Sequence, residues 1–367
     1  MKIVVFGSSI VSCYWNGAAT YYRGIYKYLA RRGHQIVFAE PDAYGRQQHR
    51  DQDDFSYVES IVYRPTVDID RMLDRASEAD IVIKHSGLGV DDSLLEERVL
   101  ELKPQCGVFF WDVDAPATIA RLRANEGDPF RFAISEYDGI LTYGGGPNIA
   151  SAYRSFGAQA YYSIYNGLDP ETHYAVAQDP ELACDVVFLG NRLPDREARV
   201  EELFLRVAEL APQKRFILGG EGWGDKQLPS NVRWIGHVTT GDHNRVNCSA
   251  RIVMNINRSS MASFGFSPPT RVFEVAGAGT CMVCDEWPGI QECFEPEKEI
   301  LIVRCAEDVA QILRNYEERA CRCIGDAFHA RALRDHTYTQ RAAQADHALT
   351  ECLQSRSLSH AVVAARS

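Results

Sequence analysis

The sequence predicts an α/β protein made of two Rossmann-like domains, each a parallel sheet with helices on both faces. Short apolar runs alternate with longer amphipathic stretches along most of the chain, which is the pattern of strand–helix–strand units. The alternation is interrupted once, near residues 165–182, by a segment rich in Pro, Asp and turn residues. A length of 367 residues also favours two domains over one. We therefore expect one domain over residues 1–165 and a second over 170–330.

In the first domain, short apolar runs predict the strands and helical periodicity predicts the connections between them. The runs KIVVFG, QIVFAE, DIVIK, GVFFW and GILT predict strands at 2–7, 35–40, 80–84, 107–111 and 139–142. The helix predicted over 19–33 ends at Gly33, a common C-terminal stop. Further helices are predicted over 69–78, 92–102 and 147–156.

The second domain repeats this alternation after the linker. Apolar runs predict strands at 185–190, 215–219, 232–235, 251–257, 280–285 and 299–303. Helices are predicted over 194–210, near 241–249, and over 270–277, 306–322 and 324–353. Two such domains are expected to face each other across a cleft between the carboxyl ends of their strands, where α/β sheets bind ligands.

Charge and cysteine content exclude several classes of protein. With 39 Lys and Arg against 50 Asp and Glu, the net charge is −11, which argues against nucleic-acid or anionic-membrane partners. The 11 cysteines, the absence of a signal-peptide pattern and the lack of a run of ~18 apolar residues predict a cytoplasmic protein with reduced thiols. Cys281 and Cys284 form a C-x-x-C pair inside the run TCMVCD, which indicates a buried strand rather than a metal or redox site.

Two turns of the first domain are candidates for acceptor binding. Asn16 and Gly17 lie between the first strand and its helix, in a loop of aromatic and small residues that suits a hydroxyl-rich ligand. Gly144 and Gly145 follow the strand at 139–142 and would let a ligand approach the backbone closely. An ordinary turn, packed by a Trp in the first case, explains either pattern as well.

Three residues of the first domain are candidates for a general base. Asp112 and Asp114 follow the strand at 107–111, and His85 follows the strand at 80–84. The Asp-x-Asp spacing also occurs at residues 51–53 and 68–70, so it does not by itself indicate a metal site. The alternative for the two aspartates is helix capping or surface charge. The alternative for the histidine is a structural role.

The first strand ends of the second domain predict a nucleotide site. Gly190, Asn191 and Arg192 lie between a strand and a helix N-terminus, which forms a cradle for a diphosphate. The loops of the next two strands could read and stack on a nucleobase, through residues Gly220, Glu221, Trp223, His237 and Val238. Core packing is the alternative for Trp223.

The stretch 255–279 is the most informative. Asn257 and Arg258 follow a strand, and a Pro-rich turn with Ser267 opens a helix on which Arg271 and Glu274 share a face. Such a carboxylate can accept two ribose hydroxyls, and Arg258 can neutralise a leaving diphosphate. A surface Arg–Glu pair is the alternative. We expect Arg192, Arg258 and Arg271 to form one positive cluster around a diphosphate.

The run SPPTRVFEVAGAGTCMVCDEWPGIQECFEPEKEI resembles the donor-side signature of GT-B glycosyltransferases, and more closely that of the CgeB-like branch. The matching residues are Ser267, Pro268, Arg271, Phe273, Glu274, Gly279, Asp285, Trp287, Gly289, Phe294, Glu295, Glu299 and Ile300. The resemblance implies the GT-B fold and sugar transfer from a nucleotide sugar without an essential metal or cofactor. It implies that Glu274 holds the ribose, that Gly190, Asn191, Arg192 and Arg258 surround the diphosphate, and that a C-terminal helix, about 335–355, packs back on the first domain.

One position departs from the family pattern. Retaining GT-B enzymes often carry a second Glu eight residues before the ribose Glu, and here that position is Phe266. The sugar and the stereochemistry therefore stay open, with retention favoured by analogy; an inverting enzyme would need one of the three base candidates. The acceptor is expected to be a small molecule or a glycan. A GT-B nucleotide-sugar epimerase and a non-catalytic sugar-nucleotide-binding protein are the alternative functions.

Overall fold

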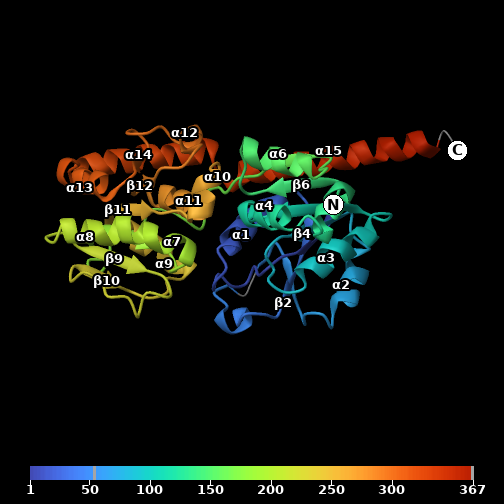
Figure 1. Cartoon of the computed structure of the whole chain (residues 1–367), viewed down its shortest axis with the longest axis horizontal. Coiled ribbons are helices and arrows are strands. Elements are labelled where there is room, and N and C mark those ends of the chain that lie inside the picture. Colours follow the sequence, from blue (N-terminus) through green and yellow to red (C-terminus); the bar gives the residue numbers. More distant parts are fainter. Residues whose placement is uncertain (53–54, 365–367) are drawn as a thin grey trace. The chain divides into compact units, whose positions relative to one another are not determined.

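The structure is a computed structural model, and it describes residues 1–52 and 55–364. The chain divides into two compact units, each with its own sheet (Figure 1). Unit 1 comprises Met1–Tyr165 together with the chain from Tyr338 onwards, and unit 2 is Asn166–Thr337. In both units every strand pairing is parallel, so the α/β prediction with Rossmann-like units is confirmed.

Unit 1 contains a seven-stranded sheet in the order β3-β2-β1-β4-β5-β6-β7. Its strands are β1 (Lys2–Phe6), β2 (Gln35–Pro41), β3 (Glu59–Tyr63), β4 (Ile81–His85), β5 (Gly107–Asp112), β6 (Gly139–Thr142) and β7 (Tyr161–Ser163). The strand order reverses between β1 and β4, so the loops after these two strands border the position where such sheets bind ligands. The sequence prediction missed β3 and β7, which are the two edge strands and are less deeply buried than the central ones.

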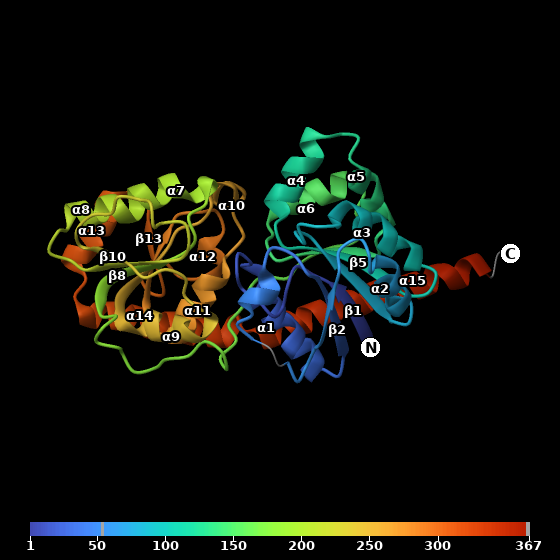
Figure 2. The same cartoon turned by 90° about the horizontal axis from the view of Figure 1, so that it is seen from below.

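Helices cover both faces of this sheet (Figure 2). They are α1 (Ala18–Arg31), α2 (Ile69–Ala76), α3 (Asp92–Arg98), α4 (Ala115–Ala124), α5 (Pro129–Ala133), α6 (Pro147–Ser155) and α15 (Tyr338–Ala364), with short 3₁₀ turns at Arg46–His49, Val99–Leu102 and Ile134–Glu136. The C-terminal helix α15 packs on α1. Gly24 permits the close approach, because a Cβ there would lie 2.3 Å from the ring of Tyr338.

Unit 2 contains a six-stranded sheet in the order β10-β9-β8-β11-β12-β13. Its strands are β8 (Cys184–Leu189), β9 (Phe216–Gly219), β10 (Val232–Trp234), β11 (Ala250–Asn255), β12 (Cys281–Asp285) and β13 (Leu301–Val303). The order reverses between β8 and β11, which are direct neighbours. The loops after β8 and β11 therefore meet at the carboxyl edge of the sheet.

The helices of unit 2 differ from the prediction mainly near its end. They are α7 (Pro194–Val200), a π-helical turn (Glu201–Leu205), α8 (Arg206–Leu210), α9 (Thr240–Ser249), α10 (Ser259–Phe264), α11 (Thr270–Ala278), α12 (Ile290–Cys293), α13 (Ala306–Asn315) and α14 (Glu318–Asp335). The predicted helix 324–353 is wrong as one element: it is the end of α14 followed by α15. The break falls at His336 and Thr337, whose backbone pairs with Leu168; the Leu168 amide donates to the His336 carbonyl at 2.7 Å.

Strand alternation separates the apolar residues of unit 2 into two cores. Cys281 packs in the core on one face of the sheet and Cys284 in the core on the other. Residues three apart in a strand point to opposite faces, so the two thiols cannot act as a pair. Both cysteines are buried and free, as expected for a structural strand. Of the helices described, none is both long and apolar enough to cross a membrane.

Candidate functional site

The loop after β8 brings two guanidinium groups to the edge of the unit 2 sheet. A Cβ at Gly190 would lie 2.8 Å from Nη1 of Arg196 and 3.2 Å from Nη2 of Arg271. Arg196 is in the first turn of α7, which begins at Pro194, and Arg271 is in the first turn of α11. Only a glycine lets both cations approach the backbone at this point. Helix N-termini and guanidinium groups at the reversal of strand order can bind an anion.

Arg196 lacks a carboxylate partner among the described residues. Its Nη1 donates a long hydrogen bond to the Asn191 carbonyl at 3.4 Å, and its Nε is buried without a partner. Burial, with the nearby charges of Arg271 and Arg258, lowers the pKa of Arg196 to about 9, although Asp285 and Asp195 oppose the shift. A cation under such repulsion favours an anionic ligand, and a diphosphate supplies two negative groups.

Arg271 and Arg258 complete the cluster. Arg271 donates from Nη1 to Oδ1 of Asn255 at 3.0 Å, and its guanidinium carbon lies 5.2 Å from the centroid of the Phe188 ring. Burial lowers the pKa of Arg271. Arg258 donates from Nε to the Asp195 carboxylate at 3.2 Å. We define the cationic cluster as Arg196, Arg258 and Arg271.

Arg192 is engaged with acidic neighbours rather than with this cluster. Its Nη1 donates to Asp225 at 2.8 Å and its Nη2 to Glu197 at 2.7 Å. The expected cluster of Arg192, Arg258 and Arg271 is therefore corrected to one in which Arg196 replaces Arg192. The signal was present in the sequence, since Arg196 stands in the first turn of a helix that starts at a Pro.

Glu274 lies on α11, one turn after Arg271, and is 6% exposed. Its Oε2 lies 3.3 Å from Nδ1 of His243, which is in the first turn of α9. Burial acts to raise the pKa of Glu274, but His243, His173 and Arg271 outweigh it and lower that pKa to about 2. The carboxylate is therefore ionised and adjacent to the cationic cluster. The sequence prediction did not include His243 or His173, and no spacing pattern relates them to Glu274.

The predicted nucleobase loops are only partly available for a ligand. Trp223 is fully buried and donates from Nε1 to the Gly190 carbonyl at 2.8 Å, so its predicted stacking role is wrong and the core alternative holds. A Cβ at Gly220 would lie 2.4 Å from the Gly190 carbonyl oxygen, which fixes the two loops together. The Glu221 amide donates to Oδ1 of Asn191 at 3.0 Å. His237 is exposed, and Val238 beside it is half-buried.

A buried carboxylate fixes the loop after β11. Asp285, at the end of β12, accepts hydrogen bonds from Nη2 of Arg199 at 2.6 Å and from the backbone amide of Asn257 at 2.9 Å. Burial raises the pKa of Asp285 against the effect of Arg199. Asn257 and Ser267 are themselves almost fully buried, 3% and 2% exposed. These two predicted ligand residues therefore shape the loops of the site rather than line its surface.

Of the three base candidates in unit 1, two are enclosed by protein. His85 is fully buried between the Tyr26 hydroxyl, 2.5 Å from Nε2, and the Trp111 carbonyl, 3.1 Å from Nδ1. Burial lowers the pKa of His85 to about 3, so its predicted role as a base is corrected to a neutral core residue. Asp112 is also buried; it accepts from Oγ of Ser86 at 2.6 Å and from the Tyr153 hydroxyl, and burial raises its pKa. Asp114 is half-buried at the start of α4.

In the loop after β1, the structure also gives the predicted acceptor residues other roles than expected. Asn16 is 6% exposed and donates from Nδ2 to the carbonyls of Ser9 and Ser12 at 2.8 and 3.0 Å. Its predicted contact with an acceptor is corrected to a tether within the loop. Gly17 is exposed and precedes α1. Trp15 is the exposed side chain of this loop, 46% accessible and with a left-handed φ of 48°.

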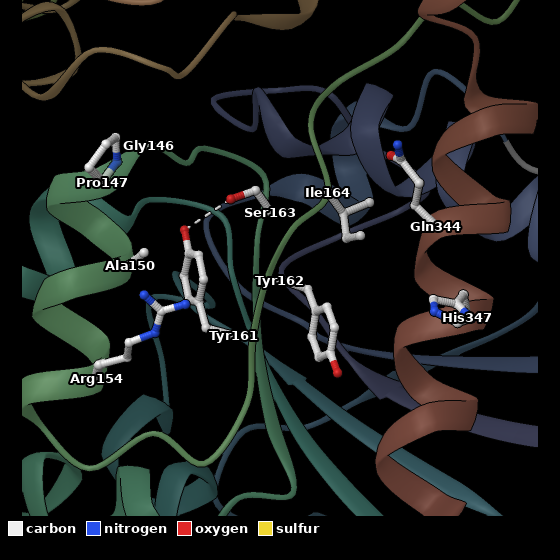
Figure 3. A pocket seen from close by; sticks show the side chains of 10 residues that line it. All are labelled: Gly146, Pro147, Ala150, Arg154, Tyr161, Tyr162, Ser163, Ile164, Gln344 and His347. Atoms are coloured by element: carbon white, nitrogen blue, oxygen red, sulfur yellow. Dashed lines mark hydrogen bonds between the residues drawn. The ribbon is translucent and has the colours of Figure 1, made fainter.

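A pocket of about 490 Å³ lies beside the glycine turn of unit 1 (Figure 3). It follows β7, with Tyr161 and Ser163 on the α6 side and Tyr162 toward α15. The Tyr161 hydroxyl and Oγ of Ser163 are 3.1 Å apart. Gly146 lines the pocket directly, while a Cβ at Gly145 would lie 2.5 Å from Oγ of Ser163. The Gly144 carbonyl accepts from the Thr142 hydroxyl, so the turn is a tight one.

Residues 196–346 match the family model described as "Glycosyl transferase-like". This range, which is less than half of the chain, is similar to that family. The matched range begins at Arg196 and includes Arg258, Arg271 and Glu274 of the site. In the part of the chain that the structure describes, no three His, Cys, Asp or Glu side chains are grouped so as to hold a metal ion. No curated protein sequence matches the chain.

Solved structures of glycosyltransferase type share the fold of the whole chain. Anabaena HepE in complex with UDP and glucose superposes with a TM-score of 0.68 at 14% identity, over 96% of this chain and 100% of that one. An α-glucosyltransferase in complex with UDP and a 13-mer DNA gives 0.70 at 13% identity, over 95% and 99%. Sucrose-phosphate synthase from Thermosynechococcus elongatus gives 0.66 at 14% identity, over 97% and 100%. The chain therefore has the GT-B fold, with a Rossmann-like sheet in each unit.

Proposed function

We propose that this protein is a glycosyltransferase, which transfers a sugar from a nucleotide-sugar donor to a hydroxyl-bearing acceptor, with the donor held by unit 2. The observation that carries the proposal is the cationic cluster of Arg196, Arg258 and Arg271 beside an ionised Glu274, at the reversal of strand order between β8 and β11. Cations and a carboxylate side by side match the two polar parts of a nucleoside diphosphate, the anionic diphosphate and the neutral ribose.

Each group in the proposed donor site has a defined task. Arg196 and Arg271, at Gly190, contact the diphosphate oxygens. Arg258 approaches the same diphosphate as its charge increases during departure of the sugar. Glu274 accepts hydrogen bonds from the ribose hydroxyls, since an ionised carboxylate can only accept. These charges favour the leaving group without a metal ion, so we propose a metal-independent reaction.

The resemblance to the CgeB-like branch belongs to this proposal, as does the stereochemistry. Phe266, where retaining enzymes often carry a carboxylate, has a left-handed φ of 48° and packs its ring against Gly289. It offers the donor sugar no charge. We favour retention, in which the acceptor attacks on the face of the departing diphosphate. If the enzyme inverts, Asp114 is the candidate base, because it is the least enclosed of the three predicted ones.

The acceptor is proposed to be a small molecule or a glycan. The α-glucosyltransferase structure contains DNA, but this chain has a net charge of −11, which disfavours a phosphate backbone as partner. The location is proposed to be a reducing, cytoplasmic one, in which Cys281 and Cys284 stay as buried thiols of the core.

Donor binding and turnover test the proposed function directly. Calorimetric titration with UDP, GDP and dTDP, followed by incubation with the corresponding nucleotide sugars, should give binding and then transfer or slow hydrolysis. A folded protein that binds none of these nucleotides would contradict the proposal. Recovery of an epimerised donor would instead identify an epimerase, and binding without any product would identify a non-catalytic binding protein.

Replacing Glu274 by Gln should weaken UDP binding by about tenfold, because a neutral amide replaces the ionised acceptor of the ribose hydroxyls. Isothermal titration of the variant and of the wild type at pH 7.5 measures the change. Glu295→Gln is a suitable control, since Glu295 is exposed and pairs with Lys298 at the surface. Equal affinities of Glu274→Gln and wild type would show that Glu274 does not contact the nucleotide.

A further inference from the structure

The Glu274 carboxylate is contacted from a second helix by a histidine with no assigned role. Nδ1 of His243, on α9, lies 3.3 Å from Oε2 of Glu274, within ion-pair distance but without the alignment of a hydrogen bond. The His243 side chain is 20% exposed and that of Glu274 is 7% exposed. Part of the His243 ring is therefore reached by solvent, while the carboxylate it faces is enclosed. Val246 of α9 and Val272 and Val275 of α11 belong to the same apolar core, so this polar pair lies beside packed apolar side chains.

The other groups around Glu274 do not duplicate this contact. His173, in the segment that precedes β8, stacks on His243 with 6.1 Å between ring centroids, and both of its ring nitrogens are buried without a hydrogen-bond partner. Burial, and then His243, lower the pKa of His173, against the opposing effects of Glu274 and Asp169. His173 is therefore neutral at pH 7. Arg271, on α11 itself, directs Nη1 to Asn255 instead.

We propose that His243 is a positioning residue of the donor site: its Nδ1 holds Oε2 of Glu274, so that the carboxylate keeps its charge and orientation toward the ribose. The inference rests on the proposed function, because it assumes that Glu274 binds the ribose. A buried carboxylate without a cationic neighbour is costly and gains a proton more easily. It also has more rotamer freedom, and an acceptor that is not held in place discriminates poorly between ligands.

The experiment compares UDP with 2′-deoxy-UDP, which lacks one of the hydroxyls that Glu274 would bind. Affinities are measured by titration calorimetry for the wild type, His243→Ala and His243→Asn. Wild type is expected to prefer UDP by about tenfold, the size of one hydrogen bond to a charged group. His243→Ala should reduce this preference to less than threefold. His243→Asn should keep an intermediate preference, since its side-chain amide places a donor near the position of Nδ1.

The pH dependence supplies a second measurement. Without His243, burial acts on Glu274 with less opposition, so its pKa rises and the carboxylate is protonated at a higher pH. The ratio of UDP affinity in His243→Ala to that in wild type should therefore be smaller at pH 5 than at pH 7.5. Using this ratio removes the titration of UDP itself, which both proteins share.

A matched variant on the same helix controls for general damage to α9. Arg245 is two residues from His243, has a side chain 54% exposed and pairs with Asp179 and Asp242 rather than with Glu274. Arg245→Gln should leave both the UDP preference and the affinity ratio at their wild-type values. Thermal denaturation of all variants shows whether they fold.

Each remaining outcome decides between the two proposals. If wild type binds no UDP, the proposed function fails with this nucleotide and the inference fails with it. If wild type binds UDP and prefers it over 2′-deoxy-UDP, but folded His243→Ala retains the full preference, the positioning role is overturned while the proposed function stands. A wild type that binds both nucleotides equally would remove the ribose role of Glu274 and overturn the inference.

Discussion

Replacing Arg196 by alanine is expected to weaken UDP binding on the order of 100-fold, the largest loss of affinity we predict for a single residue. A guanidinium group and a diphosphate form charge-assisted hydrogen bonds, each worth about 1.5–3 kcal/mol, and two of them account for a loss of this size. Arg196 has no competing carboxylate among the described residues and makes one long hydrogen bond to the Asn191 carbonyl, so most of its donors are available to the ligand.

The same substitution should not lower the stability of the free protein. The pKa of Arg196 is lowered to about 9 in the folded state, so the charged form is less favourable there than in the unfolded chain. For a base with a depressed pKa, this destabilisation is fully present at pH 7, decreases as the pH rises above the folded-state value and is lost only above the unfolded-state value. Alanine removes the cost and also some packing of the side-chain stem. The thermal midpoint is therefore expected to stay within a few degrees of wild type.

Arg192→Ala is the comparison that makes this result specific. Arg192 is already neutralised by Glu197 and Asp225, so its removal should change UDP affinity by less than about fivefold. Titration calorimetry of both variants measures the two losses side by side. A larger loss for Arg192→Ala than for Arg196→Ala would mean that the loop rearranges around the diphosphate and that our choice of cationic cluster is wrong.

Replacing Asp285 by alanine is expected to cost about 3 kcal/mol of unfolding free energy, the largest loss of stability we predict. Removing one partner of a buried ion pair leaves the charge of the other partner without compensation, here the guanidinium group of Arg199. The backbone amide of Asn257 also loses its acceptor. Arg199 is 30% exposed, and water can satisfy part of its guanidinium group, which keeps the cost at the lower end of the usual range. Equilibrium denaturation in urea measures the loss.

A surface aspartate from the same unit provides the control. Asp225 is 81% exposed and pairs with Arg192, so Asp225→Ala should change the unfolding free energy by less than about 0.5 kcal/mol. Asp285→Asn should be milder than Asp285→Ala, because the amide oxygen can still accept from Asn257. If Asp285→Ala were as stable as wild type, the carboxylate would not be what holds the loop after β11.

The central strands of the sheets could be predicted from the sequence, whereas the edge strands of unit 1 could not. The strand at 139–142 was predicted with both of its boundaries, because GILT is a short apolar run between clear turn signals. The edge strands β3 and β7 were missed, since a half-exposed strand lacks a continuous apolar run. The break between α14 and α15 was also missed, because it depends on the pairing of Thr337 with Leu168, a contact between distant parts of the chain.

In the candidate site, the sequence identified positions more reliably than roles. Gly190, Arg271 and Glu274 could be located from a strand followed by a helix, and the structure brings them together. His85 and Trp223 satisfied the same local criteria, yet both are fully buried. Position at the end of a strand is a local property, whereas exposure depends on which side chains of other elements cover that position.

The sequence by itself determined the α/β class, the linker near residues 165–182 and the run from Ser267 onwards that resembles glycosyltransferases, since these follow from local periodicity and from residue order. The tertiary structure decided which charges are free to act. Arg192 and Arg196 are four residues apart and chemically identical, but Glu197 and Asp225 neutralise the first, while the second faces Gly190 and two other cations. An electrostatic environment is the sum over neighbours in space, and those neighbours come from elements far apart in the chain.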